Sequence, residues 1–172
     1  MNRAGGEGDD VAGQQAGRST SVPAAAAPAA AAAAVERHVI VVGFGLAGRA
    51  AVNSIIEQGI SYTVIESNPE VVERCIPGGL HIILGDARDA EVLGQAGIDR
   101  ATDVAVTVPN DVMTLAVVEQ ARRLSPTARI IARCTFVSGG MEATRVGADE
   151  TVIAEQVVAT EFGRVITAAL ER

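Results

Sequence analysis

The sequence contains no lysine and very few aromatic residues, and its 172 residues carry a formal net charge of −7. All fourteen basic residues are arginine, an absence of lysine that we treat as compositional bias. Proteins that bind nucleic acids hold the phosphate backbone mainly through an excess of basic side chains. The charge balance of this chain therefore argues against a nucleic-acid partner.

Cysteine is scarce as well. Cys75 and Cys134 are the only two, and they lie far apart without the C-x-x-C spacing of a metal or redox motif. Two reduced thiols in a cytoplasmic protein are therefore expected, in preference to a disulfide or a metal site. Cys134 follows an apolar strand-like run, which favours a role as a small core residue.

Motifs for several kinds of catalysis are missing. There is no H-x-x-x-H pair, no nucleophile elbow and no phosphate-loop lysine. The sequence therefore lacks the motifs typical of zinc hydrolases, acyl transferases and phosphoryl transferases. The two histidines, His38 and His81, open strand-like segments and have no catalytic partner at a readable spacing. Both are expected to be structural, and we predict neither a metal site nor a catalytic residue.

Long apolar runs are also absent, since no stretch reaches the roughly 18 strongly apolar residues that span a bilayer. Residues 1–34 are rich in Ala, Gly and Pro without apolar periodicity, which predicts a disordered tail. Its early acidic residues, Glu7, Asp9 and Asp10, argue against a secretory signal, which begins with basic residues. Residues 35–172 then form one domain of ordinary size.

What is present in that domain is a regular alternation of strand-like and helix-like segments. The strand-like runs are nearly continuously apolar, as strands buried on both faces are, and cover residues 38–42, 62–65, 81–84, 103–108, 129–132 and 150–153. Helical spacing follows at residues 47–58, 69–76, 89–96, 110–124, 136–146 and 155–170. This alternation predicts an α/β fold with a doubly wound, Rossmann-type parallel sheet of six strands in the order 3-2-1-4-5-6.

The first strand runs directly into a glycine motif. Residues 38–48, HVIVVGFGLAG, combine a short apolar strand with G-x-G-x-x-G. In this motif Gly43 allows a sharp reversal, Gly45 leaves room for a pyrophosphate, and Gly48 permits close contact between strand and helix. The backbone N–H groups of the following helix then face an anion. By itself the motif could also serve only to close a tight corner.

Glu66 ends the second predicted strand, 23 residues after Gly43. A carboxylate at this position accepts hydrogen bonds from the ribose hydroxyls and repels a 2′-phosphate. The next residues, Ser67, Asn68 and Pro69, provide no arginine to neutralise such a phosphate. We therefore predict an adenosine nucleotide without a 2′-phosphate, and the weakest binding for NADP. The alternative is that Glu66 is only a solvated charge.

Ligands of doubly wound sheets lie outside the carboxyl ends of the strands where the strand order reverses. At the end of the third strand, Asp86 could reach an adenine amino group or cap the next helix. After the fourth strand, Thr107 could offer its hydroxyl to phosphate or ribose, whereas Asn110 and Asp111 suit helix caps. Arg133, at the end of the fifth strand, could approach the same crevice or pair across a dimer.

Together these strand ends define a candidate nucleotide site. The residues predicted to bind the cofactor are Gly43, Phe44, Gly45, Leu46, Ala47, Gly48, Glu66, Ser67, Asp86, Ala87, Thr107, Val108 and Pro109.

The motifs resemble the nucleotide-binding RCK N-terminal (KTN or TrkA-N) domains that regulate potassium channels and transporters, including Kef-type exchangers. The resemblance covers about residues 37–170. It is carried by VIVVGFGLAG (39–48), VIESNPE (64–70), LGDARDAEVLGQAGIDRA (84–101), VAVTVPND (104–111), IIARC (130–134) and GADETVI (147–153). The E-x-L-x-x-A-G-I-x-x-A pattern after GDA distinguishes these domains from ordinary dehydrogenases.

The resemblance implies a cytoplasmic regulatory module, not an enzyme, that binds NAD(H), AMP, ADP or ATP. Such a module transmits its occupancy to a potassium channel or antiporter subunit, at the inner membrane face, through homodimers or rings. Its ligand contacts would be Gly43, Gly45 and Gly48 for phosphate, Glu66 for ribose, and Asp86 with Ala87 for adenine. Relatives often have an arginine after the second glycine to hold phosphates. This chain has Leu46 there, which favours AMP or another lightly charged adenosine ligand.

Two other functions are open on the residues alone. An NAD-dependent oxidoreductase, or its cofactor-binding half, would use the same glycine motif, but no second domain remains to hold a substrate against the nicotinamide. An oligomerisation scaffold with a decayed nucleotide site would also accommodate Leu46. Assembly itself is expected, because aromatic residues are few and the helices after the fourth, fifth and sixth strands carry many small apolar residues suited to close packing. The last of these helices has Val158, Phe162, Val165 and Ala169 at helical spacing, which makes one apolar stripe.

Overall fold

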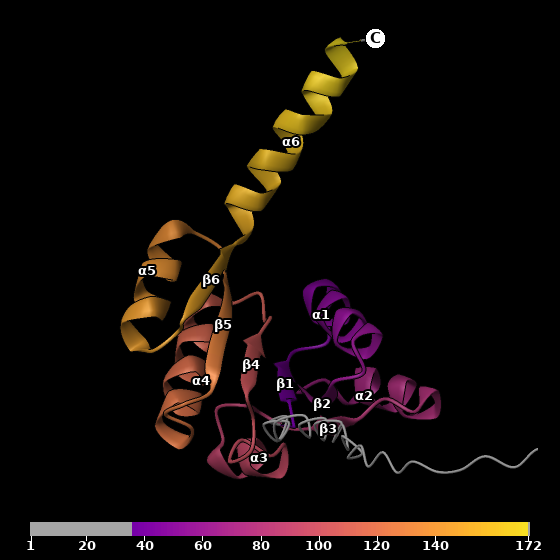
Figure 1. The fold of residues 1–172 in the computed structure, drawn as a ribbon, viewed down its shortest axis with the longest axis vertical. Helices are drawn as coiled ribbons and strands as arrows, with labels where there is room; N and C mark the ends of the chain where they lie inside the picture. Colours follow the sequence, from indigo (N-terminus) through magenta and orange to yellow (C-terminus); the bar gives the residue numbers. More distant parts are fainter. Residues whose placement is uncertain (1–35, 172) are drawn as a thin grey trace, which may run out of the picture. The chain divides into compact units, whose positions relative to one another are not determined.

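The computed structural model describes residues 36–171, so the tail predicted over residues 1–34 lies outside the described residues. In the described range, parallel strands form one six-stranded sheet with the order β3-β2-β1-β4-β5-β6. The predicted α/β fold and strand order are confirmed. Figure 1 shows the strands and helices alternating along the chain.

The strands are β1 His38–Val42, β2 Ser61–Glu66, β3 Ile82–Leu84, β4 Asp103–Val106, β5 Arg129–Cys134 and β6 Glu150–Ile153. The helices are α1 Leu46–Glu57, α2 Pro69–Cys75, α3 Ala90–Gln95, α4 Asp111–Leu124, α5 Val137–Val146 and α6 Ala154–Leu170, and a 3-10 turn η1 covers Ile76–Gly78. The fourth strand is shorter than predicted. Its pairing with β1 and β5 stops at Val106, and β1 itself ends at Val42, opposite Val106, before the turn at Gly43.

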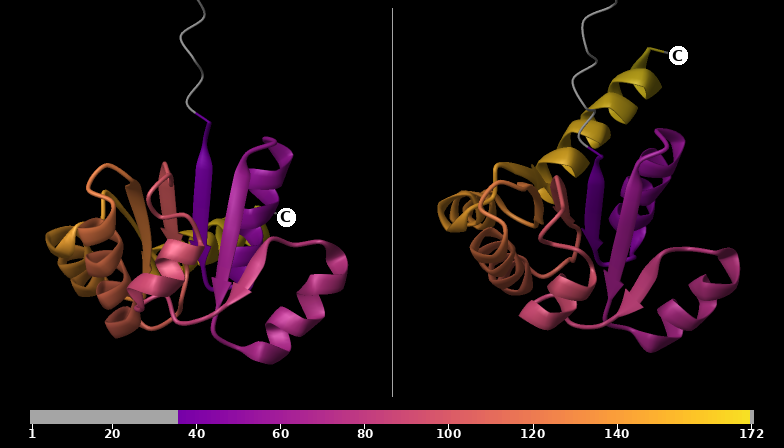
Figure 2. Two further views of the ribbon diagram at one scale, coloured as in Figure 1. Left: turned by 90° about the horizontal axis from the view of Figure 1, so that it is seen from below. Right: turned by 60° about the horizontal axis from the view of Figure 1, so that its bottom comes forward.

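Figure 2 shows helices on both sides of the sheet, and apolar side chains form a core against each of its faces. On one face, Ile40 and Val42 of β1 belong to a cluster that includes residues of α3, α4 and α5. On the other face, Val39 and Val41 pack with Val52 of α1. Because successive residues of a strand point to opposite faces, a continuously apolar strand is what a sheet covered on both sides requires. The central strand β1 and the glycine turn that follows it are therefore held firmly from both sides.

His38 closes the amino end of β1, at the edge of the sheet opposite the glycine turn. It is buried, with Nε2 2.9 Å from the carbonyl oxygen of Ala96 and Nδ1 2.9 Å from the hydroxyl of Ser61. A carbonyl oxygen can only accept, so Nε2 donates to it. His38 thereby joins β1 to β2 and to the end of α3, which is a structural role.

The last helix, α6, contains no buried residue. Its predicted apolar stripe is present, but Val158, Phe162 and Val165 remain 64%, 68% and 50% exposed. Figure 1 shows α6 extending away from the sheet beyond β6. None of the helices between residues 36 and 171 has the length and apolar character needed to cross a membrane.

Candidate nucleotide site

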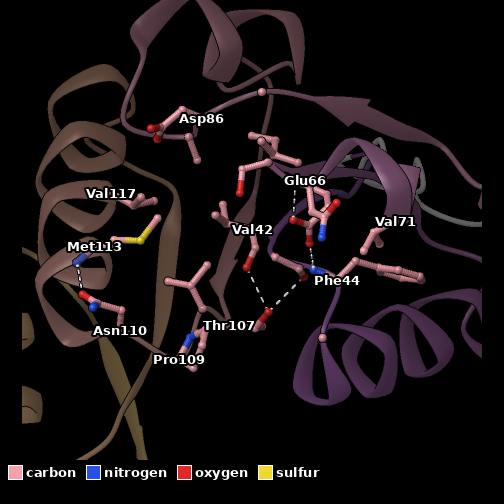
Figure 3. A pocket seen from close by; sticks show the side chains of 18 of the residues that line it. Val42, Phe44, Glu66, Val71, Asp86, Thr107, Pro109, Asn110, Met113 and Val117 are labelled. Carbon is pink, nitrogen blue, oxygen red and sulfur yellow. Dashed lines mark hydrogen bonds between the residues drawn. The ribbon is translucent and has the colours of Figure 1, made fainter. Parts of the chain in front are cut away.

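A cavity of about 450 Å³ lies at the carboxyl ends of the central strands (Figure 3). Its walls come from the glycine turn after β1, the end of β2, the loops after β3 and β4, and the first turns of α4. Ten predicted site residues line it, namely Gly43, Phe44, Gly45, Glu66, Ser67, Asp86, Ala87, Thr107, Val108 and Pro109. The other three, Leu46, Ala47 and Gly48, lie on α1 and do not line the cavity.

The glycine turn has the backbone geometry that the motif predicts. Gly43 adopts a φ of +90°, a value that disfavours any residue with a side chain. A Cβ atom on Gly48 would lie 2.1 Å from the carbonyl oxygen of Gly43, so α1 approaches the strand end as closely as two backbones can. A Cβ atom on Gly45 would meet nothing within 4 Å. The space above Gly45 is therefore open to a ligand.

The amino end of α1 is left without a side-chain acceptor. Gly45 is its N-cap residue and has no capping side chain, and the first turn contains no acidic residue. Free backbone N–H groups and the helix dipole give such an end a partial positive charge. Because Gly45 lines the cavity, this end of α1 suits a phosphate group there.

Glu66 connects the glycine turn to β2. One of its carboxylate oxygens accepts the N–H of Phe44 at 2.8 Å and the other accepts the N–H of Asn68 at 2.9 Å (Figure 3). The side chain is therefore fixed at the cavity wall and is more than a solvated charge. A carboxylate has about four acceptor positions, so Glu66 can still receive ribose hydroxyls.

Asp86 does not cap the next helix, because Asp89 is the residue whose side chain accepts the N–H of Glu91 at the start of α3. The carboxylate of Asp86 instead accepts the backbone N–H of Arg88 at 2.9 Å and pairs with its guanidinium at 2.5 Å. Hydrogen bonds from the Arg88 side chain, and then from its backbone, lower the pKa of Asp86. A ligand amino group at Asp86 would share this carboxylate with Arg88.

The Thr107 hydroxyl is directed at the backbone of the glycine turn. Its oxygen lies 2.9 Å from the carbonyl oxygen of Val42 and 3.0 Å from that of Gly43 (Figure 3). A hydroxyl has one proton to donate, and both of these partners can only accept. Thr107 therefore positions the turn, and towards a ligand its hydroxyl is an acceptor and not the phosphate donor suggested by the sequence.

Of the two expected caps at α4, Asn110 is confirmed because its side chain accepts the N–H of Met113 at 3.0 Å. The cap role is wrong for Asp111, which is already helical and accepts the N–H of Thr135 at 2.8 Å, joining α4 to the loop after β5. Arg133 donates to the carbonyl of Val108 at 3.3 Å and so reaches the cavity wall.

Several lining residues were not predicted as part of the site, including Asn68, Val71, Met113 and Val117. Arg49 is the one with a charge. Its Nε donates to the carbonyl of Phe44 at 3.3 Å, and its guanidinium carbon lies 5.3 Å from the centre of the Phe44 ring. Helical spacing could have identified it, since a residue four positions after Gly45 lies on the same side of α1.

Neither cysteine lines the cavity. Cys75 and Cys134 are free thiols, and burial, followed by the charge of Asp111, raises the pKa of Cys134. A buried thiol with a raised pKa is unreactive, as expected for a core residue. Between residues 36 and 171, no group of three His, Cys, Asp or Glu side chains could hold a metal ion.

Comparison with curated proteins finds relatives whose names describe ion transport. The chain is 28% identical over 122 residues to YbaL of Escherichia coli K12, a match that covers 71% of this chain and 22% of YbaL. It is 28% identical over 99 residues to the glutathione-regulated potassium-efflux system protein KefC of Cronobacter sakazakii, covering 58% of this chain and 16% of KefC. The chain thus spans less than a quarter of the length of these relatives.

Solved structures show the same fold. The TrkA-N domain of the E. coli inner membrane protein YbaL superposes with a TM-score of 0.71 at 26% identity, covering 75% of this chain and 96% of that domain. The GsuK channel bound to NAD gives 0.67 at 26% identity, covering 76% and 23%, and GsuK bound to ADP gives 0.67 at 26% identity, covering 78% and 35%.

The TrkA-N domain family matches residues 39–154, which is more than half of the chain. The match includes every predicted site residue. The resemblance found in the motifs is confirmed, and the chain belongs to the TrkA-N domain family.

Proposed function

We propose that this domain binds an adenine nucleotide and that its occupancy regulates a potassium channel or antiporter subunit. The observation that carries the proposal is the pairing, in one cavity, of the uncapped amino end of α1 with the fixed carboxylate of Glu66. Phosphate would bind the first, ribose the second, and adenine would lie towards Asp86 and Ala87. The GsuK channel, which has the same fold, is a nucleotide-bound relative.

Binding without catalysis fits the chemistry of the cavity better than an oxidoreductase does. Among the described residues that line it there is no His, Lys or Cys, and its two carboxylates, Glu66 and Asp86, are engaged by backbone N–H groups and by Arg88. The one hydroxyl with two backbone partners, that of Thr107, has its proton engaged. The relatives named as potassium-efflux and inner membrane proteins support a regulatory role beside a membrane partner at its cytoplasmic face.

The role of Glu66 can be tested with AMP and 2′-deoxy-AMP. The wild-type protein should bind AMP at least about tenfold more tightly than the deoxy ligand, because a hydrogen bond to a charged acceptor is worth about 1.5–3 kcal/mol. Glu66→Ala should weaken AMP binding by a similar factor and bind both ligands equally. Isothermal titration calorimetry measures all four affinities.

Glu73→Ala is the matched control, because Glu73 is exposed on α2 and does not line the cavity. It should bind AMP and 2′-deoxy-AMP as the wild type does. If the Glu66→Ala protein still preferred AMP over the deoxy ligand by the wild-type ratio, the ribose contact would lie elsewhere and the proposed cavity would be wrong.

Regulation requires that the nucleotide bind two assembly states with different affinities. A ligand that binds both equally shifts nothing, whereas a tenfold preference contributes about 1.4 kcal/mol to the favoured state. Deleting the protein should therefore change potassium flux through its membrane partner, with which it should co-purify. If potassium flux were the same with and without the protein, the regulatory part of the proposal would be wrong.

We also propose that assembly uses α6, whose apolar stripe has no partner within the described residues. Phe162→Asp should shift the protein from dimer to monomer in sedimentation velocity at micromolar concentration, with little change in unfolding, because Phe162 is 68% exposed. Thr167→Asp is the control, since helical spacing places Thr167 on the far side of α6 from the stripe. A wild-type protein that sediments as a monomer at this concentration would contradict the proposal.

A further inference from the structure

Arg49 is the only basic side chain among the described residues that line the cavity. Its backbone N–H donates to the carbonyl of Gly45 at 3.0 Å, so it lies one turn into α1, beside the free amides of the helix end. Leu46, at the position where relatives often have an arginine, is 92% exposed and does not line the cavity.

The Arg49 guanidinium is held in place, and most of its N–H donors remain available to a ligand. The Nε hydrogen bond to the Phe44 carbonyl and the Phe44 ring beneath it fix the planar group. A guanidinium has five N–H donors, and this bond uses one, so both terminal nitrogens are available to a ligand. No described carboxylate forms a salt bridge with Arg49. The carboxylate of Glu66 is held by the backbone N–H groups of Phe44 and Asn68, and Asp86, towards the adenine end of the cavity, pairs with Arg88.

We infer that Arg49 binds the second phosphate of a nucleoside 5′-diphosphate, so the ligand class of this cavity is a 5′-diphosphate and not a monophosphate. The inference depends on the proposed function and deepens it. The amides at the start of α1 would bind the phosphate nearest the ribose. Arg49, at the exposed rim of the cavity, would bind the next phosphate along the chain. A planar fork of donors matches phosphate oxygens well, and a fixed fork loses little entropy on binding.

The geometry favours the 5′-chain over a 2′-phosphate as the source of that second phosphate. Glu66 is fixed at the wall where ribose would lie, with both oxygens held by backbone N–H groups. A 2′-phosphate would meet this carboxylate, and like charges at contact repel. ADP and adenosine 2′,5′-bisphosphate carry the same number of phosphates and therefore separate the two sources.

The test measures the affinities of adenosine, AMP, ADP and adenosine 2′,5′-bisphosphate by isothermal titration calorimetry. The wild-type protein should bind ADP about tenfold more tightly than AMP. Arg49→Gln should remove that advantage and leave adenosine affinity within about twofold of wild type, since adenosine has no phosphate to lose. Arg49→Lys should retain part of the preference for ADP, because lysine keeps the positive charge but lacks the planar set of guanidinium donors.

Arg74→Gln is the control for a change of charge alone. Arg74 lies near Arg49 in the groove between α1 and α2, has no described carboxylate partner and does not line the nucleotide cavity. It should leave the ratio of ADP to AMP affinity unchanged.

Three results would overturn the inference while leaving the proposed function intact. One is wild-type binding of AMP and ADP with equal affinity. Another is that Arg49→Gln lowers the affinity for adenosine as much as the affinity for ADP, which would mean that Arg49 only supports the turn at Phe44. The third is that Arg49→Gln lowers the affinity for adenosine 2′,5′-bisphosphate more than the affinity for ADP. A wild-type protein that binds none of the four ligands would refute the proposed function itself.

Discussion

Replacing Gly48 with alanine is expected to lower the free energy of unfolding by about 3 kcal/mol and to abolish nucleotide binding. The added Cβ would lie 2.1 Å from the carbonyl oxygen of Gly43 and 3.0 Å from its carbonyl carbon. These are backbone atoms, so no side chain can rotate to relieve the overlap, and α1 must move away from β1. Guanidinium denaturation followed by circular dichroism measures the loss.

The movement would also damage the site, because Gly43 and Gly45 both line the cavity. The Thr107 hydroxyl, which would lie 3.0 Å from the new Cβ, bonds the carbonyls of Val42 and Gly43 and would be displaced with them. Loss of stability and loss of binding should therefore appear together in the Gly48→Ala protein.

Gly45→Ala is the informative companion, since a Cβ there would meet nothing within 4 Å and the φ of −74° suits alanine. Its stability should stay within about 1 kcal/mol of wild type, while nucleotide affinity falls because the methyl group occupies the space where a phosphate would approach. If Gly48→Ala were as stable as Gly45→Ala, α1 would not be locked against the strand end as the structure indicates.

These two glycines show how much a local pattern can predict. Close backbone approach at Gly48 and open space at Gly45 follow from the spacing of three glycines, because strand, turn and helix are consecutive in the chain. The strand order was equally accessible, since apolar strands alternating with helices admit few topologies.

The partners of individual side chains were harder to predict. Asp86 and Asp89 both precede α3, and only the backbone path decides that Asp89 caps it while Asp86 pairs with Arg88. The Thr107 hydroxyl turns towards carbonyls more than 60 residues earlier in the chain, a partner that no local pattern contains. The apolar stripe of α6 was visible in the sequence, but whether it packs within the domain was not.

Arg122→Met is expected to destabilise the fold by about 3 kcal/mol, because one guanidinium satisfies several backbone carbonyls at once. Arg122 donates to the carbonyl of Gly147 through Nε at 3.1 Å and Nη2 at 2.8 Å. Its Nη1 donates to the carbonyls of Pro126 and Ala128 at 2.9 and 2.8 Å. Nη2 also pairs with Asp149 at 2.6 Å. The end of α4, the start of β5 and the loop before β6 are thus tied to one side chain.

Arg123→Met changes the same charge at the next position and is the control, since the Arg123 side chain is exposed and bonds only Gln120. Its unfolding free energy should stay within about 0.5 kcal/mol of wild type. Equal unfolding free energies for the two variants in guanidinium would show that the Arg122 hydrogen bonds contribute no net stability.

Lowering the pH should reduce the difference in unfolding free energy between the wild type and Arg122→Met. Burial raises the pKa of Asp149, but the N–H of Ile130 and the Arg122 guanidinium outweigh it, so the pKa is lowered overall. A carboxyl whose folded pKa lies below its unfolded value stabilises the fold at neutral pH and loses that contribution as pH falls through the folded pKa. Arg122→Met has less of this contribution to lose. The difference in unfolding free energy between the two proteins should therefore shrink below about pH 4, and a difference that grew on acidification would contradict the Asp149 pairing.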